Sequence, residues 1–172
     1  MKIRQEKPSD YNEVNELVKI SFATNSDDDG TTHEYLDQIR KKNIFVPELS
    51  LITENDNGKI IGQIVLYKTN IITSNEEITE LLLSPICVHP EYFRKGIARS
   101  MIEESFRIAK NMGFRVVFLC GDPKIYRNFG FKPTFEYNIF HINDENRNAE
   151  WCMVYELVEN TLNNIKGTVD II

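Results

Sequence analysis

Residues 81–100, LLLSPICVHPEYFRKGIARS, decide the fold. The apolar run at their start, with the residues before it, predicts a strand over 77–88. The chain then turns and passes through Arg94, Lys95 and Gly96 into a helical pattern. The first backbone N–H groups of a helix lack intrahelical partners and carry the positive end of its dipole. A strand that leads through a basic, glycine-containing loop into a helix is suited to hold an anion, so we expect a phosphate-bearing ligand.

The residues that follow predict a strand–helix–strand unit. Apolar residues at helical spacing predict a helix over 97–112 that Gly113 ends, and the apolar run 115–120 predicts a buried strand. Two strands joined by a crossover helix are usually parallel, so we expect strands 77–88 and 115–120 to be parallel, though not necessarily adjacent. Pro85 cannot donate to a ladder, which predicts a bulge or a splayed edge inside the first of these strands.

The remaining patterns predict a mixed α/β chain with this one parallel crossover. Asn55-Asp56-Asn57-Gly58 predicts a tight hairpin turn. The tail 161–172 has no clear pattern beyond a partly extended segment, and residues 71–75 could extend the strand before them. The other expected strands cover 1–6, 49–54, 59–69, 132–142 and 150–158, and the other expected helices cover 11–22, 31–42 and 124–129.

The composition excludes several classes of protein. A formal net charge of −6 argues against nucleic acid as a main partner, so the basic residues near Arg94 indicate a pocket rather than a footprint. No apolar run approaches the roughly 18–20 residues that span a bilayer, and the first residues lack the apolar stretch of a secretory signal. We therefore expect a cytoplasmic protein with no membrane partner.

The cysteines and histidines give no sign of a metal. Cys87, Cys120 and Cys152 are far apart and odd in number, which indicates reduced core thiols rather than a disulfide framework. Neither these cysteines nor the three histidines have metal-ligand spacing, so we expect no metal.

Residues 88–98, VHPEYFRKGIA, resemble the signature of the GNAT superfamily, the acetyl-CoA-dependent N-acetyltransferases. That signature is Gln/Arg-x-x-Gly-x-Gly/Ala at the start of the central helix. Gly96 and Ala98 fit it, while Phe93 stands where Gln or Arg is usual. The order of the expected elements also matches the family from the first strand to the last.

Two further segments support the resemblance. Residues 125–131, IYRNFGF, look like the late helix of the family, in which a tyrosine precedes a Gly-Phe pair by four residues. Gly121-Asp122-Pro123 and the tail through Gly167 look like the subgroup of acetyltransferases called YhbS-like. The resemblance implies one GNAT-like domain over residues 1–172. Its fold would be a mixed, mostly antiparallel central sheet with a splayed parallel strand pair and helices on both faces.

The resemblance also implies a function and a co-substrate. The expected reaction is direct transfer of an acetyl group from acetyl-CoA to a primary amine, with no metal. The alternative is a non-catalytic acyl-CoA-binding sensor or regulatory module. Two departures from the family motivate this alternative: Phe93 replaces the usual Gln or Arg, and Leu82 stands where several members have a glutamate.

By the same resemblance, two neighbouring segments would bind CoA. The backbone of Ile86, Cys87 and Val88 would bond the pantetheine arm like an added strand and polarise the thioester carbonyl. Cys87 itself reads as a small packed residue, since nothing in the sequence supplies an activating base. The expected pyrophosphate-binding residues are Phe93, Arg94, Lys95, Gly96, Ile97, Ala98, Arg99 and Ser100.

Two residues are the expected catalytic groups. Tyr126 would be the general acid that protonates the departing thiolate, because a phenol with a pKa near 10 keeps its proton at neutral pH. Glu80 would be the base, since it lies two residues before Leu82 and on the same strand face. Glu77 and Asp122 are lesser candidates, and a solvent-mediated route without a dedicated base remains an alternative.

The acceptor amine is left open by the sequence. Its site is expected to involve the loop around Asp27–Thr32, the second helix and the hairpin before the last strand. Acidic residues in that loop indicate a cationic amine, which could belong to a small molecule, a peptide N-terminus or a protein lysine. The oligomeric state is also open, with a homodimer as one alternative.

Overall fold

The computed structural model describes residues 1–26 and 28–171. Asp27, in the expected acceptor loop, and Ile172, the last residue of the tail, lie outside the described residues. The chain divides into two compact units. The first unit comprises Met1–Tyr67 and Ser84–Ile108, and the second comprises Lys68–Leu83 and Ala109–Ile172.

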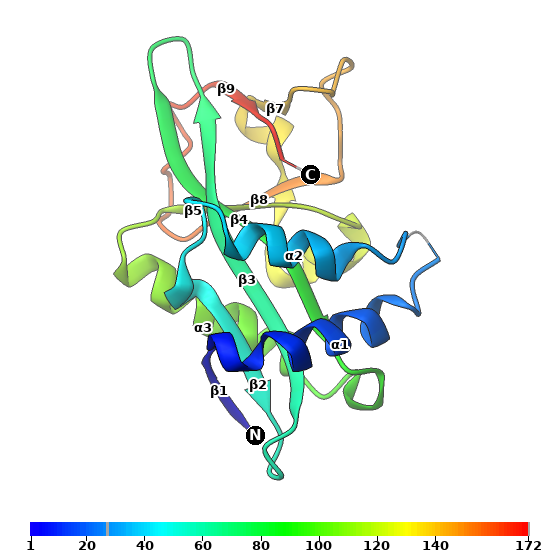
Figure 1. Ribbon diagram of the computed structural model, residues 1–172. Helices are drawn as coiled ribbons and strands as arrows, with labels where there is room; N and C mark the ends of the chain where they lie inside the picture. Colours follow the sequence, from blue (N-terminus) through cyan, green and yellow to red (C-terminus); the bar gives the residue numbers. More distant parts are fainter. Residues whose placement is uncertain (27, 172) are drawn as a thin grey trace. The chain divides into compact units, whose positions relative to one another are not determined.

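The first unit is built on an antiparallel ladder. Strand β1 (Lys2–Gln5) pairs with β2 (Ser50–Glu54), which pairs with the first part of β3 (Ile60–Ile72). These three strands lie side by side in Figure 1. The Asn55–Gly58 hairpin joins β2 to β3 as the sequence predicts, with Gly58 at a φ of 78°.

Helices cover both faces of this ladder. Tyr67 on β3 contacts Tyr35 on α2 (Thr32–Arg40), whereas Gly62 on β3 contacts the start of α3 (Ile97–Asn111). Residues 62 and 67 are an odd number of positions apart, so they point to opposite faces of the strand. Helix α1 (Tyr11–Phe22) packs beside α2, with Val14, Leu17 and Val18 buried at helical spacing.

A buried ion pair fixes α2 within the first unit. The Arg40 guanidinium, nearly inaccessible to solvent, pairs with the buried carboxylate of Glu6 and also with Asp37. Ser50 donates a further hydrogen bond to Glu6 at 2.7 Å. Because removing one partner would leave a charge buried, these contacts fix the end of α2 against the residues after β1.

The second unit contains the parallel strand pair. Leu81 and Leu82 of β4 (Glu77–Val88) pair in parallel with β5 (Val116–Cys120). Strand β5 pairs antiparallel with β8 (Cys152–Glu156), which pairs antiparallel with β6 (Lys132–Pro133). The short helix α4 (Pro123–Tyr126) follows β5. The mixed α/β fold class and the parallel relation of strands 77–88 and 115–120 are confirmed.

One expectation in the C-terminal part is wrong, and the partly extended segment expected in the tail takes a definite form. The single strand expected over 132–142 is broken into β6, a 3-10 turn at Thr134–Tyr137 and β7 (Ile139–His141), because Asn138 adopts a left-handed φ of 58°. The tail contains a strand, β9 (Gly167–Val169). It pairs antiparallel with the end of β3 and in parallel with β7, which adds a second parallel pair.

Other boundaries shift by a few residues. The helix expected over 124–129 is α4 followed by a 3-10 turn at Arg127–Phe129. The peptide bond before Pro85 is cis. Strand β3 continues to Ile72, within the segment expected to extend it. The remaining 3-10 turns are Pro8–Asp10, Pro47–Leu49 and Pro90–Tyr92.

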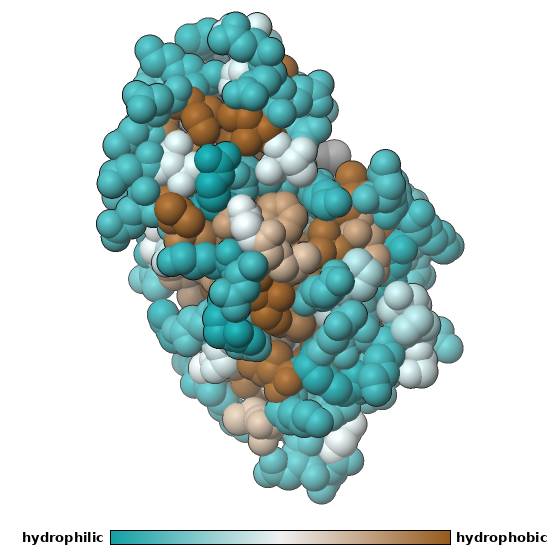
Figure 2. Space-filling view, turned by 90° about the vertical axis from the view of Figure 1, so that its left-hand side faces the viewer, coloured by the Kyte–Doolittle hydropathy of each residue, from teal (hydrophilic) through white to brown (hydrophobic). Residues whose placement is uncertain are grey.

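The surface agrees with the composition. On the face drawn in Figure 2, hydrophilic side chains predominate and apolar ones appear in patches between them. Among residues 1–26 and 28–171, no helix has the length and apolarity that crossing a membrane requires.

Candidate active site

The end of β4, assigned to the pantetheine arm, is held by two hydrogen bonds within the first unit. The buried hydroxyl of Ser21 on α1 donates to the Val88 carbonyl at 3.0 Å. The backbone N–H of His89 donates to the Ile61 carbonyl of β3 at 2.8 Å. The parallel pairing of β4 with β5 covers only Leu81 and Leu82. The strand end is therefore fixed to α1 and β3 rather than by a longer parallel ladder.

Cys87 on this strand end is a packed thiol. Its sulfur lies 4.0 Å from Oε1 of Gln63, and burial raises its pKa to about 12. A thiol with such a pKa keeps its proton at neutral pH and is a poor nucleophile. The contacts therefore favour a packing role for the side chain, in line with the sequence.

The loop after β4 has the backbone conformation of an anion site. A 3-10 turn at Pro90–Tyr92 is followed by Arg94 and Gly96 with φ of 61° and 78°, and α3 begins at Ile97. Glycine adopts this left-handed conformation without the strain that other residues meet. An added Cβ on Gly96 would meet no atom within 4 Å, so there is space for a ligand beside it. The chain can therefore present the N–H groups at the start of α3 to a phosphate.

The side chains of this loop are exposed and basic. Arg94, Lys95 and Arg99 are exposed, and so is Phe93, at 48%. The Lys95 ammonium lies 4.7 Å from the centre of the Tyr92 ring. Positive charge beside the helix N-terminus adds to the attraction for an anion.

Three residues that hold this part of the first unit in place were not singled out from the sequence: Tyr92, Gly62 and Ser21. The Tyr92 hydroxyl accepts a hydrogen bond from Asn55 in the β2–β3 turn at 3.1 Å. Gly62 lets α3 approach β3 closely, since a Cβ there would lie 3.1 Å from atoms of both Ile97 and Met101. A glycine inside a strand is a signal of such close approach, so Gly62 could have been found. Ser21 carries no comparable signal.

In the second unit, Tyr126 is held by aromatic neighbours at the end of α4. Its ring contacts Phe129 and Phe131, with centroids 6.3 and 6.0 Å away, and lies directly over Gly121. Burial raises the pKa of Tyr126 above its ordinary value of 10. Asp122 caps α4 by accepting a bond from Lys124 N–H at 2.8 Å, which is a structural role. Tyr126 is thus a fixed phenol that keeps its proton at neutral pH.

Glu80, also in the second unit, is a buried carboxylate with three donors. It is 2% exposed, and Oε2 accepts from the backbone N–H groups of Arg115 and Val116 at 2.8 and 3.1 Å. Oε1 accepts from Nε of Arg115 at 3.2 Å. Glu80 thus satisfies the backbone at the start of β5. A carboxylate offers about four acceptor positions, so Oε1 still has one for a further proton donor.

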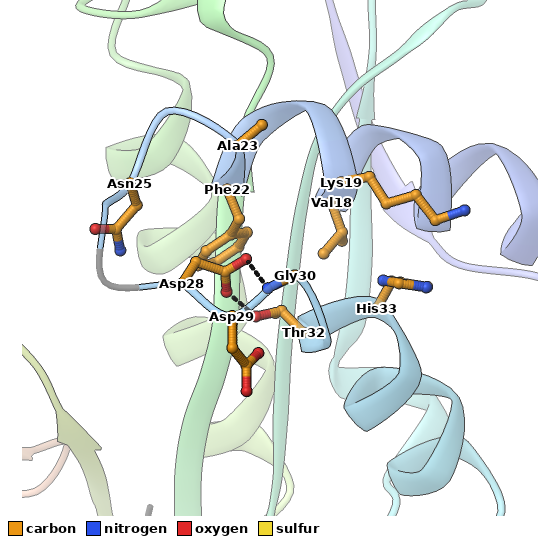
Figure 3. A pocket seen from close by; sticks show the side chains of 10 residues that line it. All are labelled: Val18, Lys19, Phe22, Ala23, Asn25, Asp28, Asp29, Gly30, Thr32 and His33. Carbon is orange, nitrogen blue, oxygen red and sulfur yellow. Dashed lines mark hydrogen bonds between the residues drawn. The ribbon is translucent and has the colours of Figure 1, made fainter.

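A cavity of about 420 Å³ opens in the first unit between the end of α1 and the start of α2. Figure 3 shows charged and polar side chains around it: Lys19 and His33 from the helices, and Asp28 and Asp29 from the loop. Both oxygens of Asp28 are hydrogen-bonded, to Gly30 N–H and to the Thr32 hydroxyl. Hydrogen bonds from Thr31 lower the pKa of Asp29, which is exposed and carries its charge at neutral pH.

The residues assigned to CoA form one continuous part of the first unit, whereas Tyr126 and Glu80 belong to the second. Among the described residues, no cluster of three or more His, Cys, Asp or Glu side chains has an arrangement that could hold a metal ion.

Sequence similarity connects the chain to a family and to relatives. Residues 2–134 match the acetyltransferase (GNAT) domain family. The uncharacterized N-acetyltransferase YhbS of Escherichia coli (strain K12) is 24% identical over 176 residues, covering 99% of this chain and 95% of the relative.

Solved structures show the same fold. A crystal structure of the GNAT family N-acetyltransferase YhbS from Escherichia coli in complex with CoA has a TM-score of 0.85 and 22% identity, over 98% of this chain and 88% of that one. A GNAT family acetyltransferase from Brucella melitensis in complex with acetyl-CoA has a TM-score of 0.77 and 24% identity, over 98% and 94%. Since the family match covers well over half of its length, the chain belongs to the acetyltransferase (GNAT) domain family.

Proposed function

We propose that the protein is an acetyl-CoA-dependent N-acetyltransferase that transfers an acetyl group directly to a primary amine, and that the whole chain acts as one catalytic domain. The observation that carries this proposal is the loop before α3. Arg94 and Gly96 have left-handed φ angles there, and the exposed basic side chains adjoin the helix N-terminus. This site suits the pyrophosphate of CoA, and two structures of the same fold are named as complexes with CoA and with acetyl-CoA.

The chemistry requires a neutral amine, a polarised thioester carbonyl and a proton for the leaving thiolate. The amine nitrogen attacks the carbonyl carbon, and the carbon–sulfur bond breaks as the tetrahedral intermediate collapses. A backbone N–H of Ile86–Val88 would stabilise the oxyanion, an interaction that strengthens as charge develops. Tyr126 would give its phenolic proton to the thiolate, because its raised pKa keeps it protonated at neutral pH.

The base would take the proton that the amine loses. We assign this role to Glu80, through the acceptor position that its three donors leave on Oε1. The burial of this carboxylate favours action through a water over direct contact with the acceptor. Glu77 is a lesser candidate, and its carboxylate accepts a hydrogen bond from Asn70 at 2.9 Å.

A second candidate function is a non-catalytic acyl-CoA-binding module. Two observations favour it: Phe93 is exposed where the family signature has Gln or Arg, and Leu82 is buried where several members have a glutamate. Such a module would keep the N–H groups of the loop, and therefore CoA binding, without a dedicated base.

The acceptor is proposed to be a cationic amine held at the cavity between α1 and α2. Asp29 supplies an exposed carboxylate there, although Lys19 offsets part of the negative charge. We also place the protein in the cytoplasm, a reducing compartment in which its free thiols would be maintained. A homodimer remains an alternative to a monomer, which light scattering of the purified protein decides.

One experiment separates the two functions. Calorimetry with CoA measures binding, and release of free thiol from acetyl-CoA with a panel of amines measures turnover. The proposal predicts both. Binding without turnover of any amine would assign the protein to the binding modules, and absence of binding would rule out both functions.

A further inference from the structure

Two cysteines of the second unit stand directly opposite each other on neighbouring strands. Cys120 is the last residue of β5 and Cys152 the first of β8, and the antiparallel register pairs them. Both are free thiols in the structure. The proposed acetyl transfer uses neither of them.

The hydrogen bonds between β5 and β8 show which kind of antiparallel pair Cys120 and Cys152 form. Gly121 N–H donates to the Trp151 carbonyl at 2.9 Å, so the pair next to the cysteines is a hydrogen-bonded one. Hydrogen-bonded and non-hydrogen-bonded pairs alternate along an antiparallel ladder. Cys120 and Cys152 therefore form a non-hydrogen-bonded pair, and the bond from Leu157 N–H to the Arg115 carbonyl fits the same alternation.

This kind of pair suits a disulfide. In non-hydrogen-bonded pairs the Cα atoms are about 4.5 Å apart and both side chains point to the same face. Disulfides join residues whose Cα atoms are about 4.4–6.8 Å apart. The bond could thus form without separating the strands.

The two thiols also interact in the reduced state. The Cys120 thiol donates to the Ile171 carbonyl at 3.6 Å, and the interaction between the two cysteine side chains raises the pKa of Cys120 and lowers that of Cys152, while burial acts to raise both. Loss of a proton from one thiol therefore affects loss of the proton from the other. The thiolate is the reactive form of cysteine. A thiolate formed by either residue would lie beside the thiol of the other. Cys152 is buried, but Cys120 is partly exposed, which gives a small oxidant access to the pair.

We propose that Cys120 and Cys152 form an oxidation site at which a peroxide converts the two thiols to a disulfide. The thiolate of the pair attacks one peroxide oxygen, so that a sulfur–oxygen bond forms while the oxygen–oxygen bond breaks and water leaves after protonation. The second sulfur then gives up its proton and attacks the first. The sulfur–sulfur bond forms, the sulfur–oxygen bond breaks and a second water leaves. The two sulfurs lose two electrons, which the peroxide takes up.

The position of the site gives the bond a structural consequence. It would close the loop between residues 120 and 152, which carries α4 and Tyr126. The ring of Tyr126 lies over Gly121, the residue after Cys120. The oxidised form should therefore be the more heat-stable one, with a midpoint about 5 °C higher.

Mass spectrometry of the full chain tests the proposal independently of acetyl transfer. Reduced protein is treated with hydrogen peroxide, its remaining thiols are alkylated, and peptides are mapped. We expect a loss of two hydrogens, about 2 Da, a Cys120–Cys152 linked peptide, and reversal by dithiothreitol. Cys87→Ala should retain the mass loss, whereas Cys120→Ser and Cys152→Ala should abolish it.

Other outcomes would overturn the site. A disulfide that includes Cys87, only oxygen additions at single cysteines, or intact thiols throughout would each do so. Because the linked peptide is identified in the wild-type chain, the result does not depend on whether the variants fold. A loss of the disulfide with normal thiol release from acetyl-CoA would leave the proposed function standing, and the reverse outcome would leave the oxidation site standing.

Discussion

Gly62 on β3 and Met101 on α3 lie so close that a Cβ on the glycine would come within 3.1 Å of the methionine sulfur. Ile97, the first residue of α3, is equally near. The spacing between the sheet and the start of the helix is therefore set by a residue without a side chain. Since the start of α3 is the proposed pyrophosphate site, this contact links packing to ligand binding.

Replacing Gly62 by valine should push the start of α3 away from β3. Overpacking of this kind costs about 1–3 kcal/mol of unfolding free energy, and we expect weaker CoA binding as well. Urea unfolding and calorimetry measure the two effects. As a control, Gly62→Val with Met101→Ala should cost less than the sum of the single changes, because the smaller side chain makes room. Strict additivity would contradict the contact.

Gly96→Ala should weaken CoA binding about tenfold, by roughly 1.4 kcal/mol, because alanine resists the left-handed φ of 78°. Gly113→Ala is the matched control. Gly113 has a φ of 94° and follows the other end of the same helix. Both changes should lower the unfolding free energy by about 1–2 kcal/mol, but only the first should change the affinity measured by calorimetry. Equal CoA affinities in the two variants would show that CoA binding does not depend on the left-handed conformation of Gly96.

How much the sequence could predict follows from how local each signal is. The limits of α1 and β4, the hairpin at Asn55–Gly58 and the start of α3 depend on periodicity and turn residues close in the chain, and all were predicted. Strand β9 could not be, because its partners are β7 and the end of β3, which are distant in sequence. The break at Asn138 depends on a single left-handed residue inside an otherwise strand-like pattern.

The same distinction applies to the candidate site. The stretch assigned to CoA is continuous, so a motif could identify it, and the family that the motif indicated is confirmed. The contact of Ser21 with Val88 joins residues 67 positions apart, and nothing in the pattern of α1 marks it. Glu80 was expected as the base, and nothing in the sequence indicated its buried surroundings. Its burial depends on Arg115 and Val116, whose backbone N–H groups donate hydrogen bonds to it only once the chain has folded.

Asp29→Asn should raise the KM for a cationic amine about threefold and leave kcat little changed, since an exposed charge acts mainly through a screened attraction. The measurement is steady-state kinetics at low and high salt, and the difference should shrink as salt rises. A neutral acceptor amine should show no change. A similar effect on both amines would argue for a packing change in the loop instead of an electrostatic one.

Tyr126→Phe should lower kcat about a hundredfold, because general acid catalysis typically contributes that much or more. Burial raises the pKa of Tyr126 above 10, so the acid stays protonated as pH rises through neutrality. The wild-type kcat should therefore not fall on account of this group until the pH exceeds 10.

Tyr137→Phe is the matched control for Tyr126→Phe. Burial also raises the pKa of Tyr137, which lies in the 3-10 turn after β6, and its loss should leave kcat unchanged. Equal kcat values for wild type and Tyr126→Phe would show that another group, or solvent, protonates the thiolate.

Glu80→Gln should lower stability as well as activity. Glutamine keeps one acceptor oxygen but presents an NH₂ group where the carboxylate oxygens meet Arg115 and Val116. A buried donor that faces other donors costs about 1–3 kcal/mol, which urea unfolding measures. Glu77→Gln, on the exposed start of β4, should be close to neutral in the same measurement.

Kinetics of Glu80→Gln then separate its two roles, since a base and a structural carboxylate predict different pH profiles. Loss of a base removes the acidic limb of the pH profile of kcat. A purely structural carboxylate would leave the limb in place and lower kcat equally at every pH. Retention of the limb, together with the loss of stability, would assign Glu80 to the start of β5 and transfer the role of base to Glu77 or to water.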